Sequence, residues 1–283
     1  MLVQCLTDQA GNCPSFRARV APYADLVSAK VVQRITPGSK IWLHRVLTRQ
    51  ASTVFDYDDG IHLGRQKFFE KTVKQTKVVL AGCDTLAEAA LAAGAKDVRI
   101  WRTGVDTSAY HVNTHTDQAC PLVWTGSSST VPYLTGFADV LSKTKQTVRV
   151  ICDRRPIWQV PTQFVPWSPI TQTQALLGCS IGLAPLPDNA WTRCKCAFKI
   201  VQYMAAGLPV VASAVGANQE LFKYYDCKGI CARTDKEFLD GILWLQNDPA
   251  ERQRMGLANR KIAEQHFDYK VLATTLTDVL CQS

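Results

Sequence analysis

The sequence predicts an α/β protein built from two doubly wound, Rossmann-like units. Short apolar runs alternate with helix-like segments along the whole chain, and this alternation is typical of parallel sheets with crossover helices. The alternation occurs in two series, which the polar, aperiodic stretch Thr107–Gln118 separates. A length of 283 residues fits about two domains. We expect an N-terminal unit over 1–114, a C-terminal unit over 119–267, and a last helix, 268–281, that packs back on the first unit.

The first series contains five apolar runs that predict strands. They are Val31–Ile35, Ile41–Val46, Thr53–Asp56, Val78–Leu80 and Val98–Trp101. Apolar residues at helical spacing predict helices over Phe16–Ser28, Lys67–Gln75 and Leu86–Ala93. Only Thr36–Ser39 separates the first two runs, whereas a parallel crossover takes about ten or more residues. We expect those two strands to form a hairpin, or the domain to be pruned.

The second series follows the same pattern and ends in helices. The predicted strands are Leu122–Thr125, Val148–Cys152, Gln163–Val165, Ile181–Ala184 and Pro209–Ala212. The predicted helices are Tyr133–Ser142, Gln172–Leu177, Phe198–Ala206, Asn218–Tyr225, Lys236–Gln246, Pro249–His266 and Tyr269–Leu280.

Composition excludes several classes of protein. The chain is 47% hydrophobic and 20% charged, which excludes general disorder, and its apolar runs are shorter than the roughly 18–20 residues that cross a bilayer. The first residues lack the basic region of a signal peptide. Eleven cysteines, an odd number without a CxxC pair, predict neither a disulfide framework nor a zinc site. We therefore expect a reducing, cytoplasmic location.

A net charge of +8 fits an anionic small ligand, nucleic acid or an anionic membrane face, and it equally fits an ordinary solvated surface. No basic stripe is interleaved with aromatic residues, so nucleic acid is disfavoured. The basic lean of the N-terminal part points to peripheral contact with an anionic membrane.

Polar loops follow several of the predicted strands. They are Gly11–Ser15, Asp56–Gly60, Gly126–Thr130, Pro166–Ser168, Pro187–Lys199 and Val215–Glu220. In open parallel sheets, ligands bind at the carboxyl ends of strands, and backbone N–H groups with Ser and Thr hydroxyls suit phosphate. The loops indicate a phosphorylated ligand. Neither GxGxxG nor GxxxxGK[ST] is present, which argues against a standard NAD domain or a P-loop.

The segment Phe198–Glu220 carries a specific pattern. It reads FKIVQYMAAGLPVVASAVGANQE, and it resembles the nucleotide-sugar signature of the group 1 (family 4) glycosyltransferases of GT-B fold, K-x-x-E-Y-M-A-x-G-x-P-V-V-A-S followed by V-G and a Glu. Further matches fall in the same order along the chain: Pro22–Asp25, Val54–Asp59, Thr103–Asp106, Pro185–Asp188 and Trp191–Arg193.

The resemblance implies residues that bind a nucleoside-diphosphate sugar. Departure of the diphosphate needs cations and hydrogen-bond donors, which Arg17, Arg193, Lys195 and Lys199 would supply. Gly11 would let the backbone approach the diphosphate, and Gly126 and Ser127 would line its phosphate side. Gln202 stands where the family has a ribose-binding Glu. Trp167 would lie near the base, and Asn218 and Glu220 would lie in the next loop.

This sequence departs from the family pattern at the acids. The family's E-x7-E pair falls on Cys194 and Gln202, and Ser127–Thr130 replaces an Arg and Lys pair. We expect Asp188 to be the carboxylate nearest to the donor sugar. His44 and His62, near the acidic cluster Asp56–Asp59, are candidates for a catalytic base, and Asp59 for orienting an acceptor.

The resemblance thus implies a metal-independent hexosyltransferase that takes a UDP- or GDP-sugar, needs no other cofactor, and retains the anomeric configuration. Two alternatives stay open. One is a catalytically impaired GT-B paralogue that binds nucleotide or glycan, and the other is a nucleotide-sugar epimerase.

Overall fold

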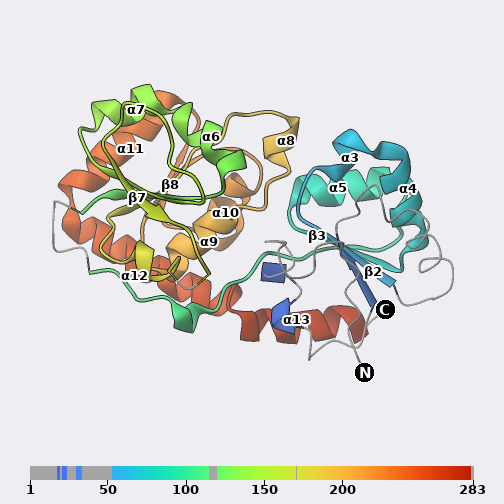
Figure 1. The fold of residues 1–283 in the computed structure, drawn as a ribbon. Coiled ribbons are helices and arrows are strands. Elements are labelled where there is room, and N and C mark those ends of the chain that lie inside the picture. The colour runs from blue at the N-terminus through green and yellow to red at the C-terminus, as the bar shows by residue number, and fades with distance from the viewer. Residues whose placement is uncertain are drawn as a thin grey trace. The chain divides into compact units, whose positions relative to one another are not determined.

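The computed structural model describes residues 18–19, 21–23, 30–33, 53–114, 120–169 and 171–281. Its contacts divide the chain into two compact α/β units, so the predicted fold class is confirmed (Figure 1). Unit 1 comprises Met1–Gly104, Asn189–Cys196 and Tyr269–Ser283, and unit 2 comprises Val105–Asp188 and Ala197–Asp268. The sequence placed the division at 114–119; the contacts group Val105–Asn113 with unit 2 and Asn189–Cys196 with unit 1.

Unit 1 is built on a parallel sheet with the strand order β1-β2-β3-β4. These strands are β1 (Lys30–Gln33), β2 (Thr53–Tyr57), β3 (Val78–Ala81) and β4 (Val98–Ile100). The helical segments of the unit are η1 (Ala21–Tyr23), α3 (Ile61–Gly64), α4 (Gln66–Gln75), α5 (Asp84–Ala92), α8 (Ala190–Arg193) and α13 (Tyr269–Cys281). β1 pairs in parallel with β2, from Lys30 opposite Thr53 to Gln33 opposite Asp56. The predicted strand Ile41–Val46, and with it the expected hairpin, lies outside the described residues.

Alternation along β2 sends its side chains to two apolar layers. Phe55 and Tyr57 stack on each other, with ring centroids 5.2 Å apart, and both contact Phe69 of α4. Val54 faces the opposite layer, whose members are Tyr23, Val78, Leu80, Trp101, Leu272 and Leu276. The sheet is therefore covered by α4 and α5 on one face and by α13 on the other.

Unit 2 is built on a six-stranded parallel sheet in the order β10-β9-β8-β5-β6-β7. Its strands are β5 (Leu122–Thr125), β6 (Val148–Cys152), β7 (Thr162–Pro166), β8 (Ile181–Ala184), β9 (Val210–Ser213) and β10 (Gly229–Ala232). The helical segments are η3 (Thr107–Ala109), η4 (Ser128–Thr130), α6 (Val131–Thr135), α7 (Ala138–Lys143), η5 (Gln174–Leu176), α9 (Phe198–Ala205), α10 (Ala217–Tyr225), α11 (Asp235–Asn247) and α12 (Pro249–His266).

The core of unit 2 lies between this sheet and its helices. Every residue of β5, β8 and β9 is buried, as expected for central parallel strands. On one face α7 packs against α11, and the ring of Phe137, the N-cap of α7, lies 5.0 Å from the ring of Phe238 in α11. Elsewhere in the unit α9 packs on β8 and on α12.

The segment after β4 is held on unit 2 by polar contacts. Val105 N–H donates to the Phe267 carbonyl over 2.9 Å. The amide of Asn113 donates to the Ala206 carbonyl over 2.8 Å and accepts from Gly178 N–H over 2.7 Å. The described part of the predicted linker is thus fixed to this unit.

Candidate functional site

The candidate site lies at the carboxyl ends of β5 and β8 in unit 2. β5 is the first strand of its sheet along the chain, and it has β6 on one side and β8 on the other. From β5 the next two strands in sequence, β6 and β7, extend the sheet to one side, and β8, β9 and β10 extend it to the other. The direction of the strand order therefore reverses between β5 and β8. In open α/β sheets, ligands bind outside the carboxyl ends of the strands at such a switch point.

Gly126 begins the loop after β5 and is closely surrounded. A Cβ at this position would lie 2.4 Å from Trp124 Cη2 and 2.7 Å from Thr130 Oγ1. Its N–H donates to the Ile151 carbonyl over 3.0 Å. Only glycine fits here, and the reason is packing within the loop. The predicted phosphate contact of Gly126 stays a prediction.

Ser127 caps η4, and the next residue is fixed to the loop after β6. Ser127 and Thr130 form a reciprocal capping box. Ser128 donates to the Asp153 carboxylate through its N–H (2.6 Å) and its hydroxyl (2.8 Å). The Ser128 hydroxyl is the main cause that lowers the pKa of Asp153, so this carboxylate is ionised. The β5 loop and the β6 loop are therefore held together at the switch point.

Lys199 lies in the first turn of α9 and reaches the residues of β5. Its Nζ sits 4.9 Å from the ring centroid of Trp124, in a cation–π contact. Ala197, the N-cap of α9, has a φ of +54°, in the left-handed region that a side chain disfavours. The predicted cation is thus placed at the switch point, beside the helix N-terminus.

Trp167 and Gln202, which the sequence treated separately, meet through a third residue. The amide oxygen of Gln172 accepts from Trp167 Nε1 over 3.1 Å and from Gln202 Nε2 over 3.4 Å. Gln202 Nε2 also donates to the Tyr110 hydroxyl over 3.3 Å. Burial raises the pKa of Tyr110 to about 12, so its hydroxyl stays protonated. Sequence reasoning missed Tyr110 and Gln172 because neither belongs to a motif.

Asn218 and Glu220 lie in the first turns of α10. The Asn218 amide donates to the carbonyls of Ala184 and Ser213, each over 3.1 Å, and so joins the ends of β8 and β9. Glu220 is buried in the same turn, with 8% of its surface exposed. Asn218 therefore has a structural role in shaping this edge of the sheet.

Arg193 and Lys195 belong to unit 1, whereas α9 belongs to unit 2. Lys195 Nζ forms an ion pair with Asp59 over 2.6 Å and lies 4.8 Å from the Trp191 ring centroid. Arg193 ends α8 with an exposed side chain, and its carbonyl lies 3.9 Å from Cys83 Sγ. The structure brings Lys195 together with Asp59, two residues that the sequence assigned to different roles.

The remaining candidates are dispersed. His62 lies in α3 with its ring 5.4 Å from Phe69, and among the described residues its buried Nδ1 has no hydrogen-bond partner. Burial lowers the pKa of His62, which favours the neutral imidazole. Asp188 is exposed. His44, Gly11 and Arg17 lie outside the described residues.

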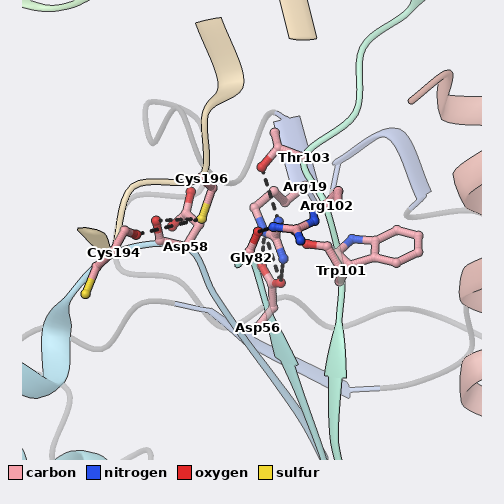
Figure 2. A network of polar contacts seen from close by, with 9 residues as sticks. All are labelled: Arg19, Asp56, Asp58, Gly82, Trp101, Arg102, Thr103, Cys194 and Cys196. Carbon is pink, nitrogen blue, oxygen red and sulfur yellow. Dashed lines mark hydrogen bonds and ion pairs between the residues drawn. The ribbon is translucent and has the colours of Figure 1, made fainter. Parts of the chain in front are cut away.

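A buried polar network in unit 1, drawn in Figure 2, centres on Arg19 and joins it to Asp56. Arg19 Nε lies 3.1 Å from both carboxylate oxygens of Asp56, and its Nη1 donates to the Trp101 carbonyl over 2.5 Å. Alongside, Cys196 Sγ lies 3.2 Å from the Asp58 carbonyl. Asp56, the member of the acidic cluster that lies within β2, therefore has an internal structural partner, Arg19, which the sequence did not reveal.

Two features are absent from the described residues. No group of three or more His, Cys, Asp or Glu side chains there is arranged to hold a metal ion. No helix in that part of the chain is long and apolar enough to cross a membrane.

The fold places this chain among GT-B proteins, because solved structures align with both of its units. The alignment with sucrose-phosphate synthase from Thermosynechococcus elongatus covers 90% of this chain and 73% of the synthase, at 13% identity and a TM-score of 0.69. The alignment with HepE from Anabaena, solved with UDP and glucose, covers 89% of this chain and 78% of HepE, at 15% identity and a TM-score of 0.66. The alignment with the UDP-forming α,α-trehalose-phosphate synthase from Burkholderia vietnamiensis covers 90% of this chain and 72% of the synthase, at 13% identity and a TM-score of 0.61. Likeness at these identities establishes the fold.

Residues 196–262 match the family described as glycosyl transferases group 1. The resemblance that Phe198–Glu220 predicted is confirmed, and the matched segment contains α9, Lys199 and Gln202. Comparison with the curated proteins found no match.

Proposed function

We propose that this chain transfers a hexose from a nucleoside-diphosphate sugar, with UDP as the preferred carrier, to an acceptor hydroxyl. The observation that carries the proposal is the position of Lys199, within the group 1 match, at the carboxyl end of β5. HepE, a structural neighbour, is solved with UDP and with UDP-glucose, which supports the choice of UDP.

The difficult step is departure of the diphosphate, because negative charge develops on the leaving oxygen. Lys199 would stabilise that charge as a cation, and the N-terminus of α9 would add its partial positive charge. Neither group has to be recruited from solvent during the reaction, since α9 is anchored on β8 and α12. Retention of configuration remains part of the proposal.

The nucleoside would lie over the network of Trp167, Gln172 and Gln202. An amide both donates and accepts, so Gln202 can engage a ribose diol although the family's Glu is replaced. Among the described residues, none donates a hydrogen bond to the Gln202 amide oxygen, which would serve that contact. Asp188, Asp59, His62 and His44 remain candidates for the sugar and acceptor side.

A second candidate, a catalytically impaired paralogue that binds nucleotide or glycan, is favoured by one observation. Cys194, at the first acid position of the family pattern, is a buried thiol, and burial raises its pKa to about 11. It therefore supplies no carboxylate. This candidate and the epimerase alternative predict nucleotide binding without transfer.

Calorimetric titration with UDP, GDP, ADP and UMP tests the donor site directly. We expect one diphosphate to bind tightly and its monophosphate more weakly, after which hydrolysis of the matching nucleotide sugar is measured. Folded protein that binds none of the four would contradict the proposal. Binding without hydrolysis or transfer would select the impaired paralogue.

Substitution of Lys199 by Ala should weaken UDP binding about tenfold or more, because a charge-assisted hydrogen bond contributes about 1.5–3 kcal/mol. Transfer should fall by at least as much while the thermal unfolding midpoint changes little. Lys261→Ala, which removes an exposed cation from α12, is the matched control. Undiminished UDP binding by Lys199→Ala would show that the diphosphate assignment is wrong.

A further inference from the structure

Two consecutive arginines, Arg154 and Arg155, follow β6 at the same edge of the sheet as the switch point. β6 pairs directly with β5, from Leu122 opposite Val148 to Thr125 opposite Ile151. The carboxyl ends of parallel neighbours lie at one edge, so the residues after Cys152 stand beside the loop that begins at Gly126. No motif in the sequence singled out either arginine.

The backbone on which the two arginines stand is fixed from both sides. On the β5 side, Asp153 accepts two hydrogen bonds from Ser128. On the β7 side, Trp167 N–H donates to the Cys152 carbonyl over 3.0 Å. The arginines therefore start between the β5 loop and Trp167, which are the phosphate and base ends of the proposed donor site.

Both side chains are exposed, and in the described part of the chain neither guanidinium forms a hydrogen bond or an ion pair. The nearest carboxylate in sequence, Asp153, is already engaged by Ser128. The connection from β6 to β7, residues 153–161, contains no helix that could cover them. Two positive charges are thus available at the ligand-binding edge.

The β5 loop, Gly126–Thr130, contains no positively charged residue. Residues Gly126–Thr130 supply hydroxyl and amide groups, and several of these are bound to one another or to Asp153. A dianionic diphosphate needs more positive charge than Lys199 alone provides, and planar guanidinium groups match phosphate oxygens in pairs. The β6 loop, which neighbours the β5 loop at this edge of the sheet, carries two such cations, Arg154 and Arg155.

We propose that Arg154 and Arg155 bind the phosphate groups of the nucleoside diphosphate, on the side of the site opposite to Lys199. This inference rests on the proposed function and adds to it the residues that take the donor's charge. The arginines act as binding residues that set the preference for a diphosphate over a monophosphate.

The test compares UDP, UMP and uridine by calorimetry on the full chain. The double variant Arg154→Gln with Arg155→Gln should raise the Kd for UDP at least tenfold and the Kd for UMP less, and it should leave uridine binding unchanged. The salt dependence of UDP binding should decrease with it. Arg154→Lys with Arg155→Lys should recover part of the affinity, since lysine keeps the charge without the paired donors.

The matched control removes two exposed cations from the other end of the same strand, as Lys143→Gln with Lys145→Gln. These residues precede β6 at the amino edge of the sheet, so UDP binding should be unchanged. An unchanged Kd for UDP in the arginine variant overturns the inference. An equal loss for uridine overturns it as well, because the arginines would then act on the nucleoside or on the fold.

These outcomes separate the inference from the proposed function. If the unsubstituted protein binds no nucleotide, both are wrong. If it binds UDP and Lys199→Ala weakens that binding while the arginine variant does not, only the inference about Arg154 and Arg155 is wrong.

Discussion

The carboxylate of Asp56 and the guanidinium of Arg19 are among the most deeply buried charges of unit 1, at 1% and 2% residue exposure. Burial alone would lower the pKa of Arg19, but the Asp56 carboxylate raises it, and the arginine stays charged. The carbonyl of Trp101 and the hydroxyl of Thr103 accept two further hydrogen bonds from Arg19. The pair therefore joins the carboxyl ends of β2 and β4.

Substitution of Asp56 by Asn should reduce the free energy of unfolding of unit 1 by about 3–5 kcal/mol, because it leaves a buried guanidinium uncompensated. Urea denaturation followed by circular dichroism measures the change. Asp58→Asn is the control: that side chain is partly exposed, and its backbone carbonyl, which Cys196 contacts, is unaltered. A loss below about 1 kcal/mol for Asp56→Asn would argue against a structural ion pair.

The candidate site was predictable only where a motif carries it. Lys199 and Gln202 lie in the family signature, and the structure places both in unit 2, Lys199 at the end of β5. Tyr110 and Gln172 were not predicted, since their hydrogen bonds to Gln202 join positions about 92 and 30 residues apart in sequence. Spacing along a chain contains no signal for such contacts.

At the scale of elements, burial decided which predictions succeeded. β5, β6 and β8 have the predicted bounds, because their apolar runs are nearly fully buried and end at polar or turn residues. β10 was missed, since three of its four residues are only partly buried, and pairing with β9 positions it. The predicted helix Tyr133–Ser142 is two helices, α6 and α7, divided at Gly136 and Phe137.

α4 is the element that fits the predicted membrane contact. Its buried side carries Phe69 and Val73, and its exposed side carries a row of lysines four and three residues apart: Lys67, Lys71 and Lys74. A lysine near an anionic bilayer contributes about 1 kcal/mol. This row is the part of the described surface where we expect the predicted membrane contact.

We expect the protein to float with vesicles of phosphatidylglycerol and phosphatidylcholine at low salt, and to be released as salt is raised. The triple variant Lys67→Gln, Lys71→Gln and Lys74→Gln should lower the bound fraction severalfold. A triple Gln variant of exposed lysines in unit 2, at Lys143, Lys145 and Lys261, should bind as the unsubstituted protein does. Flotation that does not depend on salt, or the absence of flotation, would show that the predicted membrane contact is wrong.

At the scale of the whole molecule, the chain passes between the two units four times, so neither unit is a single stretch of sequence. Unit 1 depends on its last piece, because Leu272 and Leu276 of α13 lie in the same apolar layer as Val54 and Leu80. Tyr269 adds an edge-to-face ring contact with Tyr23, at 5.7 Å between centroids. The stability of the first unit is therefore determined in part by residues at the far end of the sequence.

Substitution of Leu272 and Leu276 by Ala should destabilise unit 1 by about 4 kcal/mol or more, since each buried Leu→Ala change costs about 2–5 kcal/mol. Unit 2 should be unaffected, because its own core contains neither residue. Limited proteolysis with peptide mapping distinguishes the units: cleavage should increase within Thr53–Ile100 and Asn189–Cys196, while Leu122–Asp188 and Ala197–His266 stay protected. Val271→Ala, on the exposed side of α13, should leave both patterns unchanged. Equal loss of protection in the two units would show that they unfold as one cooperative body.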